Sequence, residues 1–274
     1  MTGQDLPGID ELRTFAEEAM RQAGTEAMHF YGKGDPEIRF DENLVTEAEL
    51  RLSEFFSSRL KDRFPAHQVF GDVPLRTRYV HDQEGCLWVY DALDGVANFQ
   101  AGIPLWGTSL ALLENFWPVF GMFYMPASGD LFYAEAGKAA YWNGRRITIP
   151  ESREVSNESL LFTYSRFNNH YRSGFPGKIR NLGCTAAHLC YVAAGRAEGA
   201  LLSNVSYQDL AAAQIILNAA GGEIRKVNGD KFYLNEYMEA KRIDEHILAA
   251  PPVAHQMVKL YLERAATGVT KDSD

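Results

Sequence analysis

Apolar residues recur every three to four positions in the first part of the chain, which is the spacing of one face of an α-helix. The first such segment runs from about Ile9 to Phe30 and ends at the stretch GKGDPE, which contains glycine and proline. A second segment carries a stripe of leucines and phenylalanines and predicts a helix from about Thr46 to just before Pro65. We therefore expect two amphipathic helices at the start of the fold.

The pattern then changes to short apolar runs that are typical of β-strands. A continuous run such as residues 86–90 indicates a strand buried on both faces. Asn143-Gly144 separates two further runs and predicts a tight hairpin turn. Strands are expected within residues 67–70, 86–90, 108–114, 117–125, 130–137 and 138–147. The first half should consist of helices packed on a mainly antiparallel sheet.

Strand-like and helix-like segments alternate after Pro150, which favours an α/β arrangement. We expect strands at 159–165, 178–183, 198–203 and 246–251, and helices at 184–195, 209–222 and 254–265. The change of pattern predicts an N-terminal subdomain over residues 1–150 and a C-terminal α/β subdomain over 151–267, sharing one interface. A tail follows at 268–274.

Composition narrows the class of protein. Of the 274 residues, 46% are apolar and 12% aromatic, which excludes a wholly disordered chain. No apolar stretch approaches the roughly 18 residues of a membrane span, and the first residues lack the features of a signal peptide. Three cysteines without a CxxC pair favour a reducing cytoplasm. A net charge of −9 makes the chain a poor general binder of nucleic acid.

Two carboxylates lie at the end of an apolar strand, where Asp91 and Asp94 precede Gly95. Buried carboxylates are costly when unpaired, and a divalent cation removes that cost. Carboxylate oxygens and a backbone carbonyl, such as that of Leu93, suit Mg²⁺ or Mn²⁺. If a helix begins here, the N–H groups of Gly95 and Val96 form an anion site. The alternative is structural, because Asp-Gly is a common turn signal and Asp94 could cap a helix.

The segment DALDGVANF (91–99) resembles the DPxDGTxNF signature of the inositol monophosphatase family, which are Mg²⁺-dependent, lithium-sensitive phosphatases. Other family motifs have counterparts in the same order, so that the resemblance extends from about residue 9 to residue 265. These counterparts are LVTEAE (44–49), VFGD (69–72), the stretch 120–147, LGCTAAHLCYVAAGRAEGAL (182–201) and YQDLAAAQIILNAAGGEI (207–224). The resemblance implies a layered αβαβα fold and hydrolysis of a phosphate monoester.

The resemblance also implies a metal-binding role for five residues. Asp91 would bridge two metal ions, and Leu93 would give its backbone carbonyl to one of them. Asp94 and Asp209 would bind the other ion, and Asp209 would also border the bound phosphate ester. Asp72 stands where the family has a metal-binding glutamate. The implied cofactor is Mg²⁺, with Mn²⁺ as a possible replacement.

The remaining implied roles concern water and phosphate. Glu49 stands where the family has an aspartate that helps to hold and activate water, while Gly95 and Val96 would donate backbone N–H groups to the phosphate. The implied mechanism uses two metals, one to activate the attacking water and one to stabilise the leaving oxygen. Charge placement would then supply most of the rate. The catalytic set implied in this way is Glu49, Asp72, Asp91 and Asp94.

Four positions depart from the family pattern. Val96 replaces a threonine whose hydroxyl helps to orient the attacking water, and Val73 replaces the second glutamate of the GEE motif. Asp72 is one carbon shorter, and Glu49 one carbon longer, than the family residue. Val73 and Val96 favour an alternative, in which the chain is a catalytically weakened member that binds a partner or ligand, whereas the intact set of Asp91, Asp94 and Asp209 opposes it.

Three of the acidic residues also have purely structural interpretations. Glu49 would complete a capping box with Thr46. Asp72 could be an ordinary turn residue, and Asp209 could be the N-cap of the helix that follows it. Capping and metal binding are compatible if the second carboxylate oxygen faces the cation.

Substrate specificity is the least determined feature. Leu202 stands where inositol-selective members carry a glutamate, and Gln208 replaces a tryptophan, so the pocket is not obviously one for inositol. A sugar bisphosphate, a 3′-phosphonucleotide or histidinol phosphate are alternative substrates. Polar residues after residue 165 could reach such a ligand or belong to a solvated loop: Arg166, His170, Tyr171, Arg172 and Lys178. The expected partner is a small phosphorylated metabolite, and the resemblance implies a homodimer.

Overall fold

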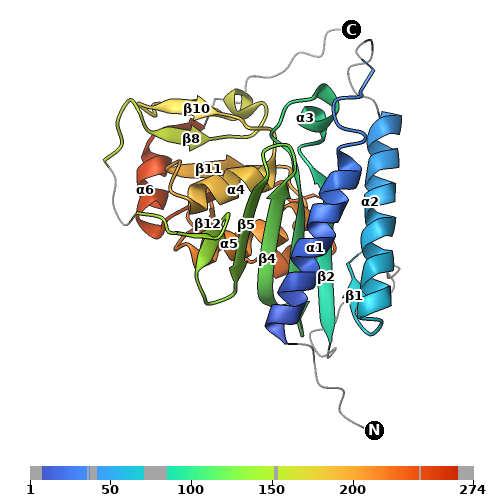
Figure 1. Ribbon diagram of the computed structural model, residues 1–274. Coiled ribbons are helices and arrows are strands. Elements are labelled where there is room, and N and C mark those ends of the chain that lie inside the picture. The colour runs from blue at the N-terminus through green and yellow to red at the C-terminus, as the bar shows by residue number, and fades with distance from the viewer. Residues whose placement is uncertain are drawn as a thin grey trace.

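The computed structural model describes residues 8–35, 37, 42–70, 85–150, 154–240 and 242–264. Its elements form five layers (Figure 1): two helices, a sheet, two helices, a second sheet and a last helix. This is the αβαβα order that the resemblance implies. Within the described residues, none of the helices is long and apolar enough to cross a bilayer.

The first layer consists of α1 (Ile9–Ala27) and α2 (Glu42–Arg63). Both helices bury one apolar stripe against the first sheet, as the periodicity predicts. Helix α2 begins at Glu42, four residues before the predicted start. Thr46 therefore lies inside the helix, and the predicted capping box between Thr46 and Glu49 is wrong, because only a residue at the helix start can cap it.

The first sheet is mainly antiparallel, as predicted. Among the described residues, its seven strands follow chain order, and β1 and β2 are the one neighbouring pair that is parallel. Asn143 and Gly144 form the predicted hairpin turn, with φ angles of 49° and 75°. The strands are β1 (Gln68–Val69), β2 (Cys86–Asp94), β3 (Gly107–Glu114), β4 (Trp117–Met125), β5 (Asp130–Glu135), β6 (Ala140–Trp142) and β7 (Arg145–Ile147). The short helix α3 (Val96–Ala101) follows β2.

The second sheet has the order β10-β8-β11-β13-β12 and mixes parallel with antiparallel pairs. Helices α4 and α5 lie between the sheets, and α6 covers the outer face (Figure 1). The elements are β8 (Leu160–Phe162), β10 (Lys178–Arg180), α4 (Thr185–Ala193), β11 (Gly199–Leu202), α5 (Tyr207–Ala219), β12 (Glu223–Lys226), β13 (Ile247–Ala250) and α6 (Pro252–Leu260). Short 3₁₀ turns occur at Phe167–Asn169 and Leu234–Tyr237.

The C-terminal helix is shorter than predicted. Helix α6 ends at Leu260, and β14 (Leu262–Arg264) pairs antiparallel with β9 (Tyr171–Ser173). Pairing with β9, about ninety residues earlier in the chain, overrides the local helical pattern of these residues. The sequence around them does not reveal this partner. The main core crosses residue 150, because Val89 and Ala111 of the first half pack in one buried cluster with α4 and α5.

Candidate active site

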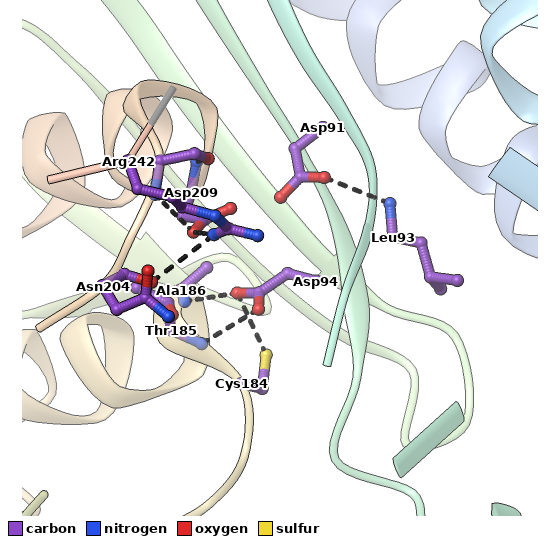
Figure 2. A network of polar contacts seen from close by, with 10 residues as sticks. Asp91, Leu93, Asp94, Cys184, Thr185, Ala186, Asn204, Asp209 and Arg242 are labelled. Atoms are coloured by element: carbon purple, nitrogen blue, oxygen red, sulfur yellow. Dashed lines mark hydrogen bonds and ion pairs between the residues drawn. The ribbon is translucent and has the colours of Figure 1, made fainter. Parts of the chain in front are cut away.

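The predicted site residues that the structure describes line one cavity of about 570 Å³. Its lining comes from α2, the end of β2, the start of α4 and the segment that leads into α5. The predicted residues that line it are Glu49, Asp91, Leu93, Asp94, Gly95, Val96 and Asp209. Asp72 and Val73 lie outside the described residues. Figure 2 shows Asp91 and Asp94 on the β2 side of this space, with Asp209 and Arg242 opposite them.

A β-bulge at the end of β2 explains how Asp91 and Asp94 reach the same cavity. In a regular strand, residues three apart point to opposite faces. Here Asp91 lies opposite Ser109 and Asp94 opposite Gly107, so three steps on β2 match two steps on β3. The extra residue resets the alternation, and both carboxylates line the cavity.

Asp94 is held by the N-terminus of α4. Its Oδ1 accepts a hydrogen bond from the Thr185 N–H at 3.0 Å, and its Oδ2 accepts one from the Ala186 N–H at 2.6 Å. The Cys184 thiol donates to the same Oδ2 at 3.3 Å. The structural alternative is therefore confirmed in part, since Asp94 does cap a helix. That helix begins 91 residues later, whereas α3 next to it has Gly95 at its N-cap.

Asp91 has one partnered and one unpartnered carboxylate oxygen among the described residues. Its Oδ1 accepts a hydrogen bond from the Leu93 N–H at 3.2 Å. Its Oδ2 is buried and has no hydrogen-bond partner among the described residues. Burial raises the pKa of Asp91 well above its ordinary value, and the charges of Asp209, Asp94 and Glu49 raise it further. An orphaned carboxylate oxygen among other carboxylates indicates a place for a cation.

Asp209 lies in the first turn of α5 and not at its N-cap, so that prediction is wrong. Ser206 is the N-cap, and the two residues form a reciprocal capping box. The Asp209 Oδ2 accepts from the Ser206 N–H at 2.7 Å, and the Ser206 Oγ accepts from the Asp209 N–H at 3.1 Å. The Arg242 guanidinium lies 3.4 Å from the same Oδ2 (Figure 2).

Glu49 and Gly95 complete the predicted site. Glu49 is half-buried on α2, and burial raises the pKa of its carboxyl group. Gly95 has a φ of 89°, and a Cβ atom there would lie 2.9 Å from the Leu105 carbonyl oxygen. Only glycine fits this turn between β2 and α3 without strain. The turn places the first residue of α3, Val96, on the cavity wall.

The donor set fits a divalent cation. Burial, and then the charge of Asp209, raise the pKa of Asp94 to about 7, although the hydrogen bonds from Ala186, Thr185 and Cys184 oppose the rise. A bound cation would remove this cost, because it favours the ionised carboxylates. In the described part of the chain, no three His, Cys, Asp or Glu side chains already stand in a metal-binding arrangement. The fit therefore rests on the buried, unpartnered Oδ2 of Asp91 and on the oxygen-only donors.

The polar residues around the rest of the cavity differ from those expected. None of the five polar candidates between residues 166 and 178 lines it. Tyr164, Ser165, Asn181 and Arg242 do, together with Gln208. Arg242 carries no motif in the sequence, so only the fold reveals it.

His188 also lines the cavity. Its Nε2 accepts a hydrogen bond from the Leu182 N–H at 2.9 Å, which leaves the ring proton on Nδ1. The Nδ1 is buried without a partner among the described residues. Burial lowers the pKa of His188 to about 4, so the ring is neutral near pH 7. His188 is thus a buried histidine whose Nε2 is hydrogen-bonded and whose Nδ1 has no partner among the described residues.

Comparison with known proteins decides the family. The model of the inositol monophosphatase family matches residues 9–257. The chain belongs to this family. Its members are phosphoric monoester hydrolases and are generally metal-dependent, so this family member is an enzyme of that class.

Three relatives illustrate the range of the family. The inositol-1-monophosphatase of Bacillus subtilis is 26% identical over 91% of this chain and 94% of its own length. The histidinol-phosphatase of Chlorobaculum parvum is 29% identical over 75% of this chain and 82% of its own. The solved structure of a Thermotoga maritima IMPase superimposes with a TM-score of 0.74 at 25% identity, covering 92% of this chain and 96% of that one.

Proposed function

We propose that this family member hydrolyses small phosphate monoesters with the help of Mg²⁺, or of Mn²⁺ in its place. The observation that carries the proposal is the buried, unpartnered Oδ2 of Asp91 in a cavity shared with Asp94, Asp209 and Glu49. Without a cation, these carboxylates repel one another and any phosphate. With cations, the same cavity becomes a site for a phosphate dianion.

Asp91, Asp94 and Asp209 are the residues that would hold the metal ions, with the Leu93 carbonyl as a further donor. Asp72 remains a predicted ligand from its sequence position alone. Bound metal would supply an activated water and charge stabilisation for the leaving oxygen. The hydrogen bonds at the start of α4 fix the Asp94 carboxylate and leave a further lone pair on its Oδ1.

In this proposal, Glu49 activates the water and the start of α3 binds the phosphate. Glu49 accepts the proton of the attacking water, and the burial that raises its pKa makes it a stronger base. The N–H groups of Gly95 and Val96 bind the phosphate oxygens. Val96 has no hydroxyl, so the orientation of the water depends on Glu49.

Inositol 1-phosphate should not be a strongly preferred substrate. Leu202 is 1% exposed and lines the cavity, and its side chain cannot accept a hydrogen bond from a substrate hydroxyl. Sites that discriminate strongly do so through such polar contacts. The homodimer implied by the family resemblance and the cytoplasmic location favoured by the cysteine content remain predictions, and sedimentation of the purified protein tests the former.

Phosphate release from a panel of monoesters tests the proposal. We expect release with Mg²⁺ or Mn²⁺ and none with EDTA. Asp91→Asn should lower turnover by at least about 100-fold. Losing an outer-shell partner of a metal ion already costs up to about 100-fold, and Asp91 would bind the metal directly. Asp62→Asn, which removes an exposed carboxylate from α2, is the matched control and should behave as wild type. No release from any ester by the metal-loaded wild type would overturn the proposal.

A further inference from the structure

The charges around the cavity are unevenly distributed. Glu49, Asp91, Asp94 and Asp209 line it as carboxylates, whereas Arg242 is the one basic side chain among the described lining residues. The Asp209 carboxylate is the charged group next to Arg242, and the neutral polar residues Ser203, Asn204 and Gln208 also line the cavity. A single guanidinium beside the metal-binding carboxylates calls for an explanation, because the proposed hydrolysis assigns it no role.

The backbone holds Arg242 at this place. The next residue, Ile243, is fully buried and forms an antiparallel bridge with Val205. Its N–H donates to the Val205 carbonyl at 2.7 Å, and the Val205 N–H donates back at 3.3 Å. The Ser203 hydroxyl donates to the Asp244 carbonyl at 3.4 Å. The main chain next to Arg242 is thus fastened to the segment that leads into α5.

The side chain, by contrast, is weakly held. The Arg242 Nη1 lies 3.4 Å from the Asp209 Oδ2 and 3.5 Å from the Asn204 carbonyl oxygen (Figure 2). Both distances are long for charge-assisted hydrogen bonds, and the side chain is 51% exposed. If a cation binds Asp209, it neutralises the partner of Arg242 and repels the guanidinium. The guanidinium is then available to another anion at the rim of the cavity.

We propose that Arg242 binds a second anionic group of the substrate, a phosphate or a carboxylate carried by the same molecule as the scissile phosphate. This rests on the proposed function and narrows its substrate class. The planar guanidinium offers a fork of N–H donors that matches such groups. A cavity of about 570 Å³ has room for a small doubly anionic ester. The buried Leu202 on the same wall offers no competing polar contact.

The proposal orders possible substrates by the charge of the group remote from the scissile phosphate. A sugar bisphosphate or a phosphorylated carboxylate should be preferred to an ester with a neutral remainder. Histidinol phosphate carries an ammonium group, which the guanidinium repels, so it should be disfavoured. Arg242 is thus a specificity residue and not part of the bond-breaking step.

Matched substrate pairs test this assignment. Glycerol 3-phosphate and 3-phosphoglycerate differ by a hydroxymethyl and a carboxylate group, and glucose 6-phosphate and glucose 1,6-bisphosphate differ by a second phosphate. For wild type, kcat/KM should favour the more anionic member of each pair. In Arg242→Gln this preference should fall by about 10-fold or more, the effect of losing one hydrogen bond to a charged group. The change should appear mainly in KM. The two pairs separate a carboxylate ligand from a phosphate ligand.

Two variants and one binding measurement complete the experiment. Arg242→Lys keeps the charge and should retain part of the preference. Arg172→Gln removes an exposed arginine of β9 that does not line the cavity, and should leave the preference as in wild type. Titration with Mn²⁺, followed by electron paramagnetic resonance, should show binding to Arg242→Gln at least as tight as to wild type, because the variant lacks the competing cation at Asp209.

The outcomes are distinguishable. If wild type releases phosphate but Arg242→Gln keeps the preference in both pairs, the assignment of Arg242 is wrong while the proposed function stands. The same holds if Arg242→Gln lowers kcat/KM equally for all four esters, or if it binds Mn²⁺ more weakly. If wild type releases phosphate from none of the esters, the proposed function itself fails. A loss of preference confined to one pair supports the assignment and names the anion.

Discussion

Acidification should destabilise this protein through His188. His188 is a buried residue of α4 that lines the cavity, and its ring stacks on Phe162 with centroids 5.3 Å apart. Protonating it would place a charge where Nε2 already accepts the Leu182 N–H. Burial therefore lowers the pKa of His188 from 6.5 to about 4. As pH falls, the unfolded chain takes up this proton first, so folding stability falls with pH between 6.5 and 4.

The magnitude follows from the two pKa values. Each pKa unit corresponds to about 1.4 kcal/mol. Between pH 7 and pH 5 the loss due to His188 is about 2 kcal/mol, since the unfolded state titrates at 6.5 and the folded state does not. For a chain of this size, that loss lowers Tm by about 4–8 °C.

The assay is denaturant unfolding at pH 7, 6 and 5, with wild type compared to His188→Gln. Glutamine does not titrate, so the stability difference between the two proteins should shrink by about 2 kcal/mol from pH 7 to pH 5. Burial also lowers the pKa of His67 and His255, but both are present in each protein and cancel in the difference. His29→Gln, at an exposed position, is the control and should track wild type. Parallel stability curves for wild type and His188→Gln would refute the reasoning.

Three further predictions concern the cavity wall. Val96→Thr should raise turnover several-fold with little change in KM, because the half-buried first residue of α3 then carries a hydroxyl that can orient water. Single-turnover kinetics can measure the change in the chemical step, and an unchanged turnover in the folded variant would contradict the prediction. Leu202→Glu should increase the preference for inositol 1-phosphate over glycerol 2-phosphate in kcat/KM, and no change would show that Leu202 is not at the substrate. Cys184→Ala should weaken Mn²⁺ binding by less than about 10-fold, because a thiol is a weak donor and Asp94 keeps two backbone donors. Cys184→Ser, which keeps a donor at this position, should bind Mn²⁺ as tightly as wild type. A complete loss of binding in Cys184→Ala would contradict this.

Most of the fold could be predicted from local patterns. The strands Trp117–Met125 and Gly107–Glu114 have strong apolar runs, and the Asn-Gly turn allows only a tight hairpin. One boundary that failed depends on the partner of an element. Leu262–Arg264 forms a strand because β9 offers an edge to it, a cause that is not local to these residues. The start of α2 also differs from the prediction, because the helix already begins at Glu42 and Thr46 lies inside it.

The candidate site was predictable where its residues lie in one short segment of the sequence, as Asp91, Asp94 and Gly95 do. It was not predictable where two distant segments meet. The bulge opposite Ser109 shows only in strand pairing, and the cap of α4 by Asp94 joins residues 91 positions apart. Arg242 was missed for the same reason, since its place in the cavity follows from the bridge between Val205 and Ile243. In each case the missing information is a tertiary contact.

The charge of the cavity predicts an order of binding. Among the described residues, four carboxylates and one guanidinium line it, so a phosphate dianion that enters the metal-free site meets repulsion that the backbone N–H groups of Gly95 and Val96 cannot offset. Metal must therefore bind before the phosphate or together with it. Calorimetric titration with inorganic phosphate should show no binding in EDTA and measurable binding with Mg²⁺. In Asp91→Asn one repulsive charge is gone, yet phosphate binding should still be lost, because the cation site is lost with it. Phosphate that bound the EDTA-treated wild type as tightly as the Mg²⁺-loaded protein would mean that the N–H groups and Arg242 suffice, and that the metal acts on the water alone.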